Sequence, residues 1–163
     1  MSKLQLEIER KFLLSKLPDV SAITAIPYER YFLERTKEVE VRIQRKGNIF
    51  TYQRKVEVPG IGRERSEDHE ISEEEFNKLK ITASKAILRT RYDLSPMIAI
   101  QVYHGDHEGL IRYEVEFPTS EDATKFQPEP WMGKEITDSP LGRDGKLLDL
   151  SPEQFTAELA RYS

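Results

Sequence analysis

The stretch Glu7-Ile8-Glu9-Arg10-Lys11 lies close to the start of the chain. Every second residue in it, Glu7, Glu9 and Lys11, is charged. Successive side chains of a β-strand point to opposite faces, so a strand here places Glu7, Glu9 and Lys11 in one row. Two carboxylates next to an ammonium group suit a divalent metal ion that carries a phosphate. A solvated surface strand has the same pattern, because charge runs are common on protein surfaces.

The composition indicates a folded protein with many charges. The chain has 163 residues, 33% of them charged, and no repeat or linker divides it, so we expect one domain over residues 1–163. It contains no cysteine, which excludes disulfides and thiolate metal sites. The start of the chain lacks the apolar run of a signal peptide and no stretch is long enough to span a bilayer, so we expect a cytoplasmic protein without a membrane partner. The net charge of −4 argues against a nucleic-acid partner.

Alternation of apolar and polar residues predicts more strands than helices. The expected strands cover residues 38–45, 49–56, 87–92, 98–103 and 110–117. Segment 63–69 also alternates, but both of its sets are polar, so the pattern does not say which face is buried. Ser72 followed by Glu75 predicts the start of a helix that runs toward Ser84, and Ser151 followed by Gln154 predicts the start of a final helix.

The polar faces of these strands collect both signs of charge. The acids are Glu7, Glu9, Glu67, Glu114 and Glu116, and the bases are Lys11, Arg42, Lys55, Arg65, Arg89, Arg91 and Arg112. An open sheet would expose them to water. A closed or nearly closed antiparallel barrel would instead turn them inward, which makes sense only around a charged ligand. Arginine and lysine neutralise phosphate oxygens, and carboxylates hold Mg²⁺ or Mn²⁺, so such a cavity favours a polyanion with a metal ion.

Several motifs, in order along the chain, resemble the CYTH-type triphosphate tunnel metalloenzymes. They are Glu7-x-Glu9-x-Lys11, Tyr31-Phe32-Leu33, Val41-Arg42-Ile43, Arg89-Thr90-Arg91-Tyr92, the turn His104-Gly105-Asp106, Glu114-Val115-Glu116, and the segment from Trp131 to Thr137. The resemblance covers nearly the whole chain. It implies an α+β, mainly antiparallel fold, a closed tunnel of eight strands with flanking helices. It also implies a small triphosphate substrate and Mg²⁺ or Mn²⁺ as cofactor, and it leaves a homodimer open.

The resemblance assigns roles to individual residues. Metal ligands are expected at Glu7, Glu9 and Glu116, with Glu114 beside them in a catalytic, supporting or second-metal role. Arg89 falls where the family often has a lysine that orients or activates the attacking water, so it is the other expected catalytic residue. The expected substrate-binding residues are Lys11, Arg42, Lys55, Arg65, Arg89, Arg91 and Arg112.

The chain also departs from the family pattern, at Glu40, Gln53, His69, Arg89, Ala99 and Gln101. The pKa of an arginine is too high for a general base, so Arg89 can only stabilise charge or orient water. Ala99 and Gln101 stand where acids are common, which weakens a second metal site, while Arg112 lies on the face of Glu114 and can replace a missing positive charge.

Two functions of different classes therefore remain. The first is a metal-dependent triphosphatase acting on inorganic tripolyphosphate, which we rank first, or on ATP or thiamine triphosphate. The second is a binding module in which these departures have removed turnover, so that the tunnel only holds a polyphosphate or nucleotide. An adenylate cyclase of the kind found in one branch of the family ranks third.

Overall fold

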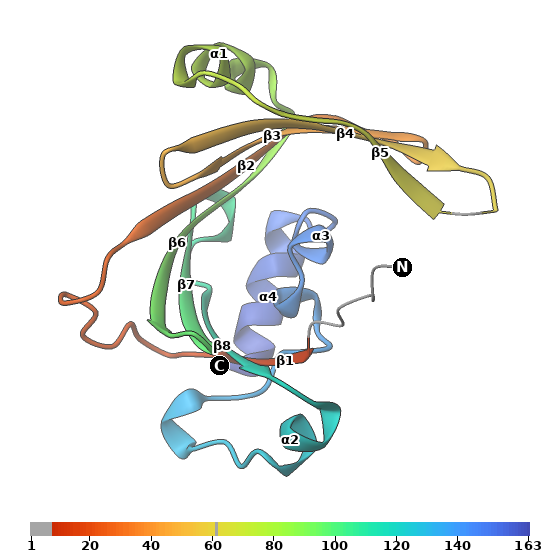
Figure 1. The fold of residues 1–163 in the computed structure, drawn as a ribbon. Coiled ribbons are helices and arrows are strands. Elements are labelled where there is room, and N and C mark those ends of the chain that lie inside the picture. Colours follow the sequence, from red (N-terminus) through yellow and green to blue (C-terminus); the bar gives the residue numbers. More distant parts are fainter. Residues whose placement is uncertain (1–7, 61) are drawn as a thin grey trace. The chain divides into compact units, whose positions relative to one another are not determined.

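The computed structural model describes residues 8–60 and 62–163, without the side chains of Arg63 and Arg65 (Figure 1). The chain forms two compact units. The terminal unit comprises Met1–Ala25 and Thr90–Ser163, and the central unit comprises Ile26–Arg89.

The described residues form eight strands and several short helices. The strands are β1 (Ile8–Leu13), β2 (Ile26–Arg35), β3 (Val39–Lys46), β4 (Ile49–Val58), β5 (Gly62–Glu70), β6 (Lys85–Ser95), β7 (Ile98–His104) and β8 (Ile111–Phe117). Their order in the sheet is β1-β8-β7-β6-β2-β3-β4-β5. The predicted α+β fold with eight antiparallel strands is thus confirmed. Within the described ranges β1 and β5 end the strand order, so hydrogen bonds between them do not close the sheet.

Strands β1, β8 and β7 of the terminal unit present two chemically different faces. Ile8 pairs with Phe117 and Phe12 with Tyr113, so apolar side chains share one face, while Glu9 pairs with Glu116 on the other. The apolar face packs into a core with loop residues, made of Phe12, Leu14, Val20, Ile100, Tyr113, Val115 and Met132. Burial of this face fixes the register, because a slip of one residue would bring the charged row into the core.

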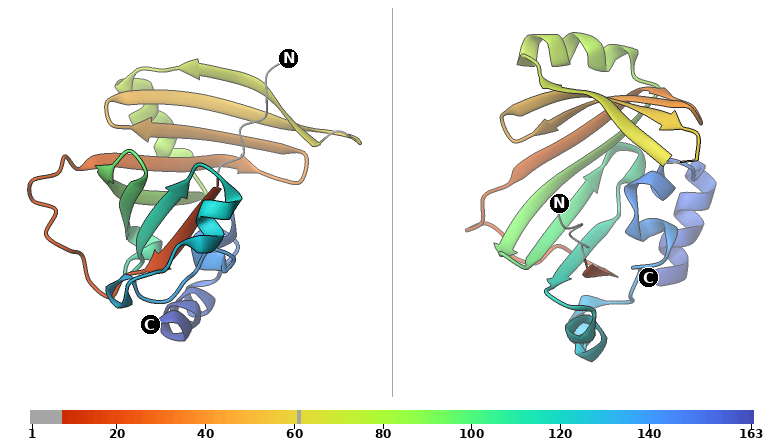
Figure 2. Two further views of the ribbon diagram at one scale, coloured as in Figure 1. Left: turned by 60° about the horizontal axis from the view of Figure 1, so that its bottom comes forward. Right: turned by 45° about the vertical axis from the view of Figure 1, so that its right-hand side comes forward.

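The C-terminal segment of the same unit folds into three short helices, η4 (Pro140–Gly142), α3 (Asp144–Leu147) and α4 (Pro152–Tyr162). Figure 2 shows α3 and α4 side by side, next to the strands of their unit. The predicted start of the final helix is confirmed: the Ser151 hydroxyl accepts from the Gln154 amide, and the Gln154 side chain accepts from the Ser151 amide. Two further helices, α2 (Ser120–Lys125) and η3 (Pro130–Met132), lie between β8 and this segment.

The central unit is a meander of β2, β3, β4 and β5 followed by α1 (Glu73–Leu79) and η1 (Lys80–Thr82). The predicted cap is present, because the Ser72 side chain accepts a hydrogen bond from the Glu75 amide. Helix α1 lies over the sheet (Figure 1), and its Phe76, which is 1% exposed, packs against Ile43 and Phe50. Truncation of such a buried phenylalanine costs about 3–5 kcal/mol.

A β-bulge interrupts β5, the segment whose two sets of side chains are both polar. The register passes from Arg54↔Glu67 to Lys55↔Arg65, which leaves Ser66 as the additional residue on β5. The Ser66 hydroxyl donates to the Arg54 carbonyl, at 3.2 Å. A bulge shifts the alternation by one residue. As a result Glu67 pairs with Arg54, whereas Arg65 pairs with Lys55. Arg54 and Lys55 point to opposite faces of β4, so Glu67 does not share a face with Lys55.

Candidate functional site

The polar face of the terminal unit carries four predicted site residues on two paired strands. In the β1–β8 register Glu9 lies opposite Glu116, and Lys11 lies opposite Glu114. Side chains directly opposite each other on antiparallel strands share a face, with Cβ atoms about 5 Å apart. The alternation predicted from the sequence therefore brings these four groups together.

A small cavity of about 30 Å³ opens on this face. Its lining includes three carboxylates and one guanidinium, from Glu9, Glu114, Glu116 and Arg91. A water molecule needs about 10–15 Å³ of such space, so the cavity accommodates one ion or a few waters but no large organic group. Arg91 also forms an ion pair with Asp93, with Nε 2.8 Å from Oδ1.

Lys11 is held by two oxygen acceptors. Its Nζ donates to the Gly142 carbonyl at 2.7 Å and lies 3.3 Å from Glu9 Oε1. Its backbone amide donates to Thr137 Oγ1 at 2.9 Å. The C-terminal segment thereby fixes both the backbone and the ammonium group of this residue.

Glu114 is buried, and each of its oxygens accepts a hydrogen bond. Gln101 Nε2 donates to Oε2 at 2.6 Å, and Arg112 Nε donates to Oε1 at 3.1 Å. Arg112 is itself only 3% exposed. Its Nη1 donates to the Leu141 carbonyl at 3.1 Å, and its Nη2 lies 3.5 Å from Asp144 Oδ1.

Electrostatics keep the buried Arg112 charged. Burial alone lowers its pKa, because a charged group loses hydration in the interior. Four neighbours raise the pKa by more, so that it lies above its ordinary value: Tyr103, Glu114, Asp144 and Glu9. Arg112 is therefore a permanent positive charge inside the terminal unit.

The donors on this face fit a divalent cation. Within residues 8–60 and 62–163 no group of three or more His, Cys, Asp or Glu side chains is placed to hold a metal ion. The two opposed carboxylates, Glu9 and Glu116, are hard oxygen donors, and Mg²⁺ is usually held by one or two carboxylates with water and phosphate oxygens as the other ligands. Glu7, the third expected ligand, lies outside the described residues.

The central unit has its own set of predicted substrate-binding residues. Arg42 Nε donates to Gln53 Oε1 at 2.8 Å, and Arg42 Nη1 lies 3.6 Å from Glu40 Oε2. Glu40 pairs with Lys55 in the β3–β4 register, and Lys55 pairs with Arg65 in the β4–β5 register. Two of the departures, Glu40 and Gln53, are therefore direct neighbours of Arg42.

Arg89, the other expected catalytic residue, makes an aromatic contact in the central unit. Its guanidinium carbon lies 5.1 Å from the centre of the Tyr28 ring, a distance typical of cation–π contacts. His69 stacks on Tyr52, with the ring centres 5.2 Å apart. Asp68 pairs with Gln53 and shares its face, whereas His69 pairs with Tyr52 on the other face.

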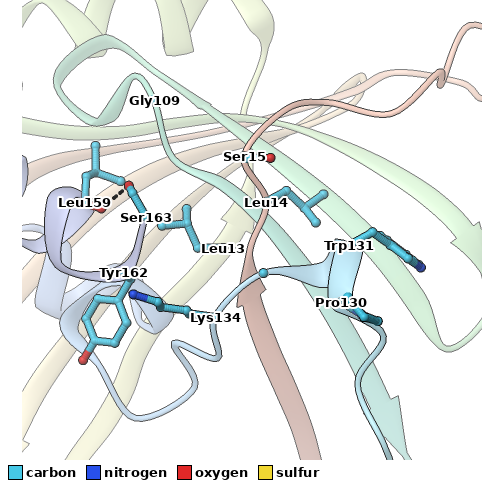
Figure 3. Close-up of a pocket in the computed structure, with 11 residues that line it drawn as sticks. Leu13, Leu14, Ser15, Gly109, Pro130, Trp131, Lys134, Leu159, Tyr162 and Ser163 are labelled. Carbon is cyan, nitrogen blue, oxygen red and sulfur yellow. Dashed lines mark hydrogen bonds between the residues drawn. The ribbon is translucent and has the colours of Figure 1, made fainter.

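A larger cavity of about 590 Å³ lies elsewhere in the terminal unit (Figure 3). Its lining is mainly apolar and includes Leu13, Leu14 and Leu159, with Lys134 and Tyr162 as polar groups. None of the described residues that line it has an acidic side chain, and none of the predicted site residues lies there. The small cavity at Glu9 and Glu116 is therefore the candidate site.

Comparison with known proteins gives a clear relationship. No family model matches the chain. The curated inorganic triphosphatase of Nitrosomonas europaea is 31% identical over 138 residues, which cover 81% of this chain and 89% of the relative. This chain belongs to the CYTH-type triphosphate tunnel family.

The solved structures agree with this assignment to the CYTH-type family. A crystal structure of the inorganic triphosphatase NE1496 matches with a TM-score of 0.77 and 27% identity, over 93% of this chain and 99% of the other. A second crystal structure, of the hypothetical protein NE1496, matches with a TM-score of 0.76 and 28% identity, over 88% and 97%. The tunnel fold expected from the sequence is thus the fold of its structural neighbours.

Sequence reasoning on this CYTH-type chain missed Asp144. Alternation and motif spacing carry no signal for it, because it is the first residue of the short helix α3 and reaches Arg112 only through the tertiary fold. The same holds for the carbonyls of Leu141 and Gly142, since any residue supplies a carbonyl.

Across the part of the chain that is described, no helix has the length and apolar character needed to cross a membrane.

Proposed function

We propose that this protein hydrolyses inorganic triphosphate with the help of a divalent cation. The observation that carries the proposal is the cross-strand pair of Glu9 and Glu116 beside Lys11, in a chain related to an inorganic triphosphatase. Carboxylates for a cation and an ammonium group for a phosphate are the two requirements for binding a metal triphosphate.

In the terminal unit we assign the cation to Glu9 and Glu116, with Glu7 as the third ligand. When bound, Mg²⁺ or Mn²⁺ supplies Lewis-acid polarisation of the phosphoryl oxygens. Lys11 binds phosphate through its ammonium group, already oriented by the Gly142 carbonyl. Arg91 lines the same cavity and adds a guanidinium that pairs with phosphate oxygens.

Within the central unit we propose phosphate-binding roles for Arg42, Lys55, Arg65 and Arg89. Arg42 is held by Gln53 and Glu40, which limits its rotamers and lowers the entropy lost on binding. We assign Arg89 to charge stabilisation and to the orientation of water, because a guanidinium does not accept a proton. No covalent intermediate is required for phosphoryl transfer of this kind.

The test is phosphate release from tripolyphosphate, ATP and thiamine triphosphate with Mg²⁺ or Mn²⁺. We expect tripolyphosphate to be the preferred substrate. Glu9→Gln and Lys11→Ala should each lower kcat/KM by about 100-fold, which is the usual effect of losing a charge-assisted contact to the reacting group. Glu108→Gln and Lys16→Ala alter exposed residues of the same type and should have no effect.

Other results would support the alternatives. Tight tripolyphosphate binding without turnover, abolished by Lys11→Ala, would indicate a binding module. Formation of cyclic AMP and diphosphate from ATP would indicate a cyclase. Cytoplasmic location and a homodimer stay predictions.

A further inference from the structure

Glu114 is the centre of a buried polar network that the family resemblance did not predict. Its two oxygens accept from Gln101 and Arg112, and the Arg112 guanidinium continues to Asp144. Tyr103 completes the network, since its hydroxyl donates to Asp144 Oδ1 at 2.6 Å. All these residues lie in the terminal unit.

We infer that Asp144 is a positioning residue, which together with Tyr103 holds the Arg112 guanidinium against Glu114. Because this fixed positive charge engages Glu114, a single divalent ion binds, at Glu9 and Glu116. The inference rests on the proposed function, because it concerns the cation of the same site. It adds Asp144 and Tyr103 to the residues that shape the candidate site, and it states that the site binds one divalent ion.

The geometry shows how Arg112 is fixed. Its guanidinium donates to the Glu114 carboxylate on one side and to the Leu141 carbonyl on another, and Asp144 lies on a third. The Tyr103 ring adds a cation–π contact, with its centre 5.1 Å from the guanidinium carbon. A planar guanidinium held at so many points has one orientation, so its charge is preorganised and costs no reorganisation during the reaction.

The same contacts argue against a second ion at Glu114. Each oxygen of Glu114 already accepts a hydrogen bond, which weakens it as a metal ligand, and Ala99, which pairs with Glu114 on β7, has no ligand to offer. The small cavity of about 30 Å³ has room for one ion or a few waters. The positive charge of Arg112, whose Nε lies 3.1 Å from Glu114 Oε1, also repels a second cation at Glu114.

The first measurement is calorimetric titration of the full chain with Mn²⁺ alone. We expect one ion per chain. Arg112→Gln removes the fixed charge and frees Glu114, so Mn²⁺ should bind about tenfold more tightly, or a second ion should bind, while kcat for tripolyphosphate falls. Arg112→Lys, which keeps the charge, should still bind one ion. Two ions in the unaltered protein, or unchanged Mn²⁺ binding in a folded Arg112→Gln variant, would overturn the inference.

Milder variants test Asp144 in case Arg112→Gln does not fold. Asp144→Asn and Tyr103→Phe loosen Arg112 without removing its charge, so kcat should fall about tenfold while KM and the number of bound Mn²⁺ ions stay the same. Asp138→Asn, at an exposed position of the same segment, is the control and should change neither. Unaltered kcat in both variants would contradict the positioning role. If the unaltered protein has no turnover, the proposed function fails, and the Mn²⁺ titration still tests the single-ion site.

Discussion

Arg10 and Glu135 form a bidentate ion pair on the face of β1 opposite Lys11. Arg10 Nη2 donates to Glu135 Oε1 at 2.6 Å, and Arg10 Nε donates to Oε2 at 3.0 Å. Thr137, whose Oγ1 accepts from the Lys11 amide, also donates to Glu135 Oε2. The hydrogen bond from Arg10 lowers the pKa of Glu135, so the folded protein favours the charged carboxylate. The pair links the N-terminal strand to the segment that orients Lys11.

This pair predicts a pH-dependent stability. A carboxyl group whose pKa is lowered in the folded state stabilises the protein above its unfolded pKa of about 4.3, and this contribution is lost as the pH falls through the folded pKa. Because Glu135 is 37% exposed, the expected cost of Glu135→Gln at pH 7 is at most about 1 kcal/mol. Urea unfolding at pH 7 and at pH 3 measures the free energy of unfolding of Glu135→Gln and of the unaltered protein. The difference between these two free energies should be smaller at pH 3 than at pH 7. The exposed Glu108→Gln is the control, and an equal cost at both pH values would refute the linkage.

At the scale of the element, η4 is a tight turn whose last position, Gly142, has room only for glycine. A Cβ on Gly142 would lie 2.3 Å from the Ile136 carbonyl oxygen and 2.7 Å from that of Thr137. The same glycine presents its own carbonyl to Lys11 Nζ. Close backbone packing of η4 therefore places a hydrogen-bond acceptor at the candidate site.

Gly142→Ala should therefore reduce both stability and activity. Overpacking of this kind costs about 1–3 kcal/mol, and movement of the turn would withdraw the acceptor from Lys11. Gly145→Ala is the matched control, because a Cβ there meets nothing within 4 Å and alanine favours a helix. Thermal unfolding and phosphate release of the two variants give the test. Equal behaviour of the two variants would contradict this account of η4.

At the scale of the whole molecule, ligand binding should stabilise the folded chain. A ligand that binds only the native state raises the free energy of unfolding by about 2.7 kcal/mol at a concentration 100 times its Kd. For a chain of 163 residues this corresponds to a rise in Tm of about 5–10 °C. We expect it with tripolyphosphate and Mg²⁺ together. Glu9→Gln should lose most of the shift, and an undiminished shift in that variant would place the cation elsewhere.

Local patterns in the sequence explain much of the fold. The caps at Ser72 and Ser151 are confirmed, because a capping box depends on residues three apart. Strand β2 was not found by alternation and was marked only by the motif Tyr31-Phe32-Leu33. Its register shifts between Phe32 and Glu34, which interrupts the alternation. In β5 both sets of side chains are polar, so the pattern did not indicate a buried face, and the bulge at Ser66 shifts the faces by one residue.

The sequence by itself determined the family, the antiparallel strands and the charged row of Glu9 and Lys11, because alternation and motif order are properties of neighbouring residues. Only the tertiary structure decided which groups Glu114 and Arg112 contact. Asp144 and the Leu141 carbonyl are 32 and 29 residues from Arg112 along the chain, and no periodic pattern connects them. Register and close backbone approach bring them together, and these depend on how the unit packs as a whole.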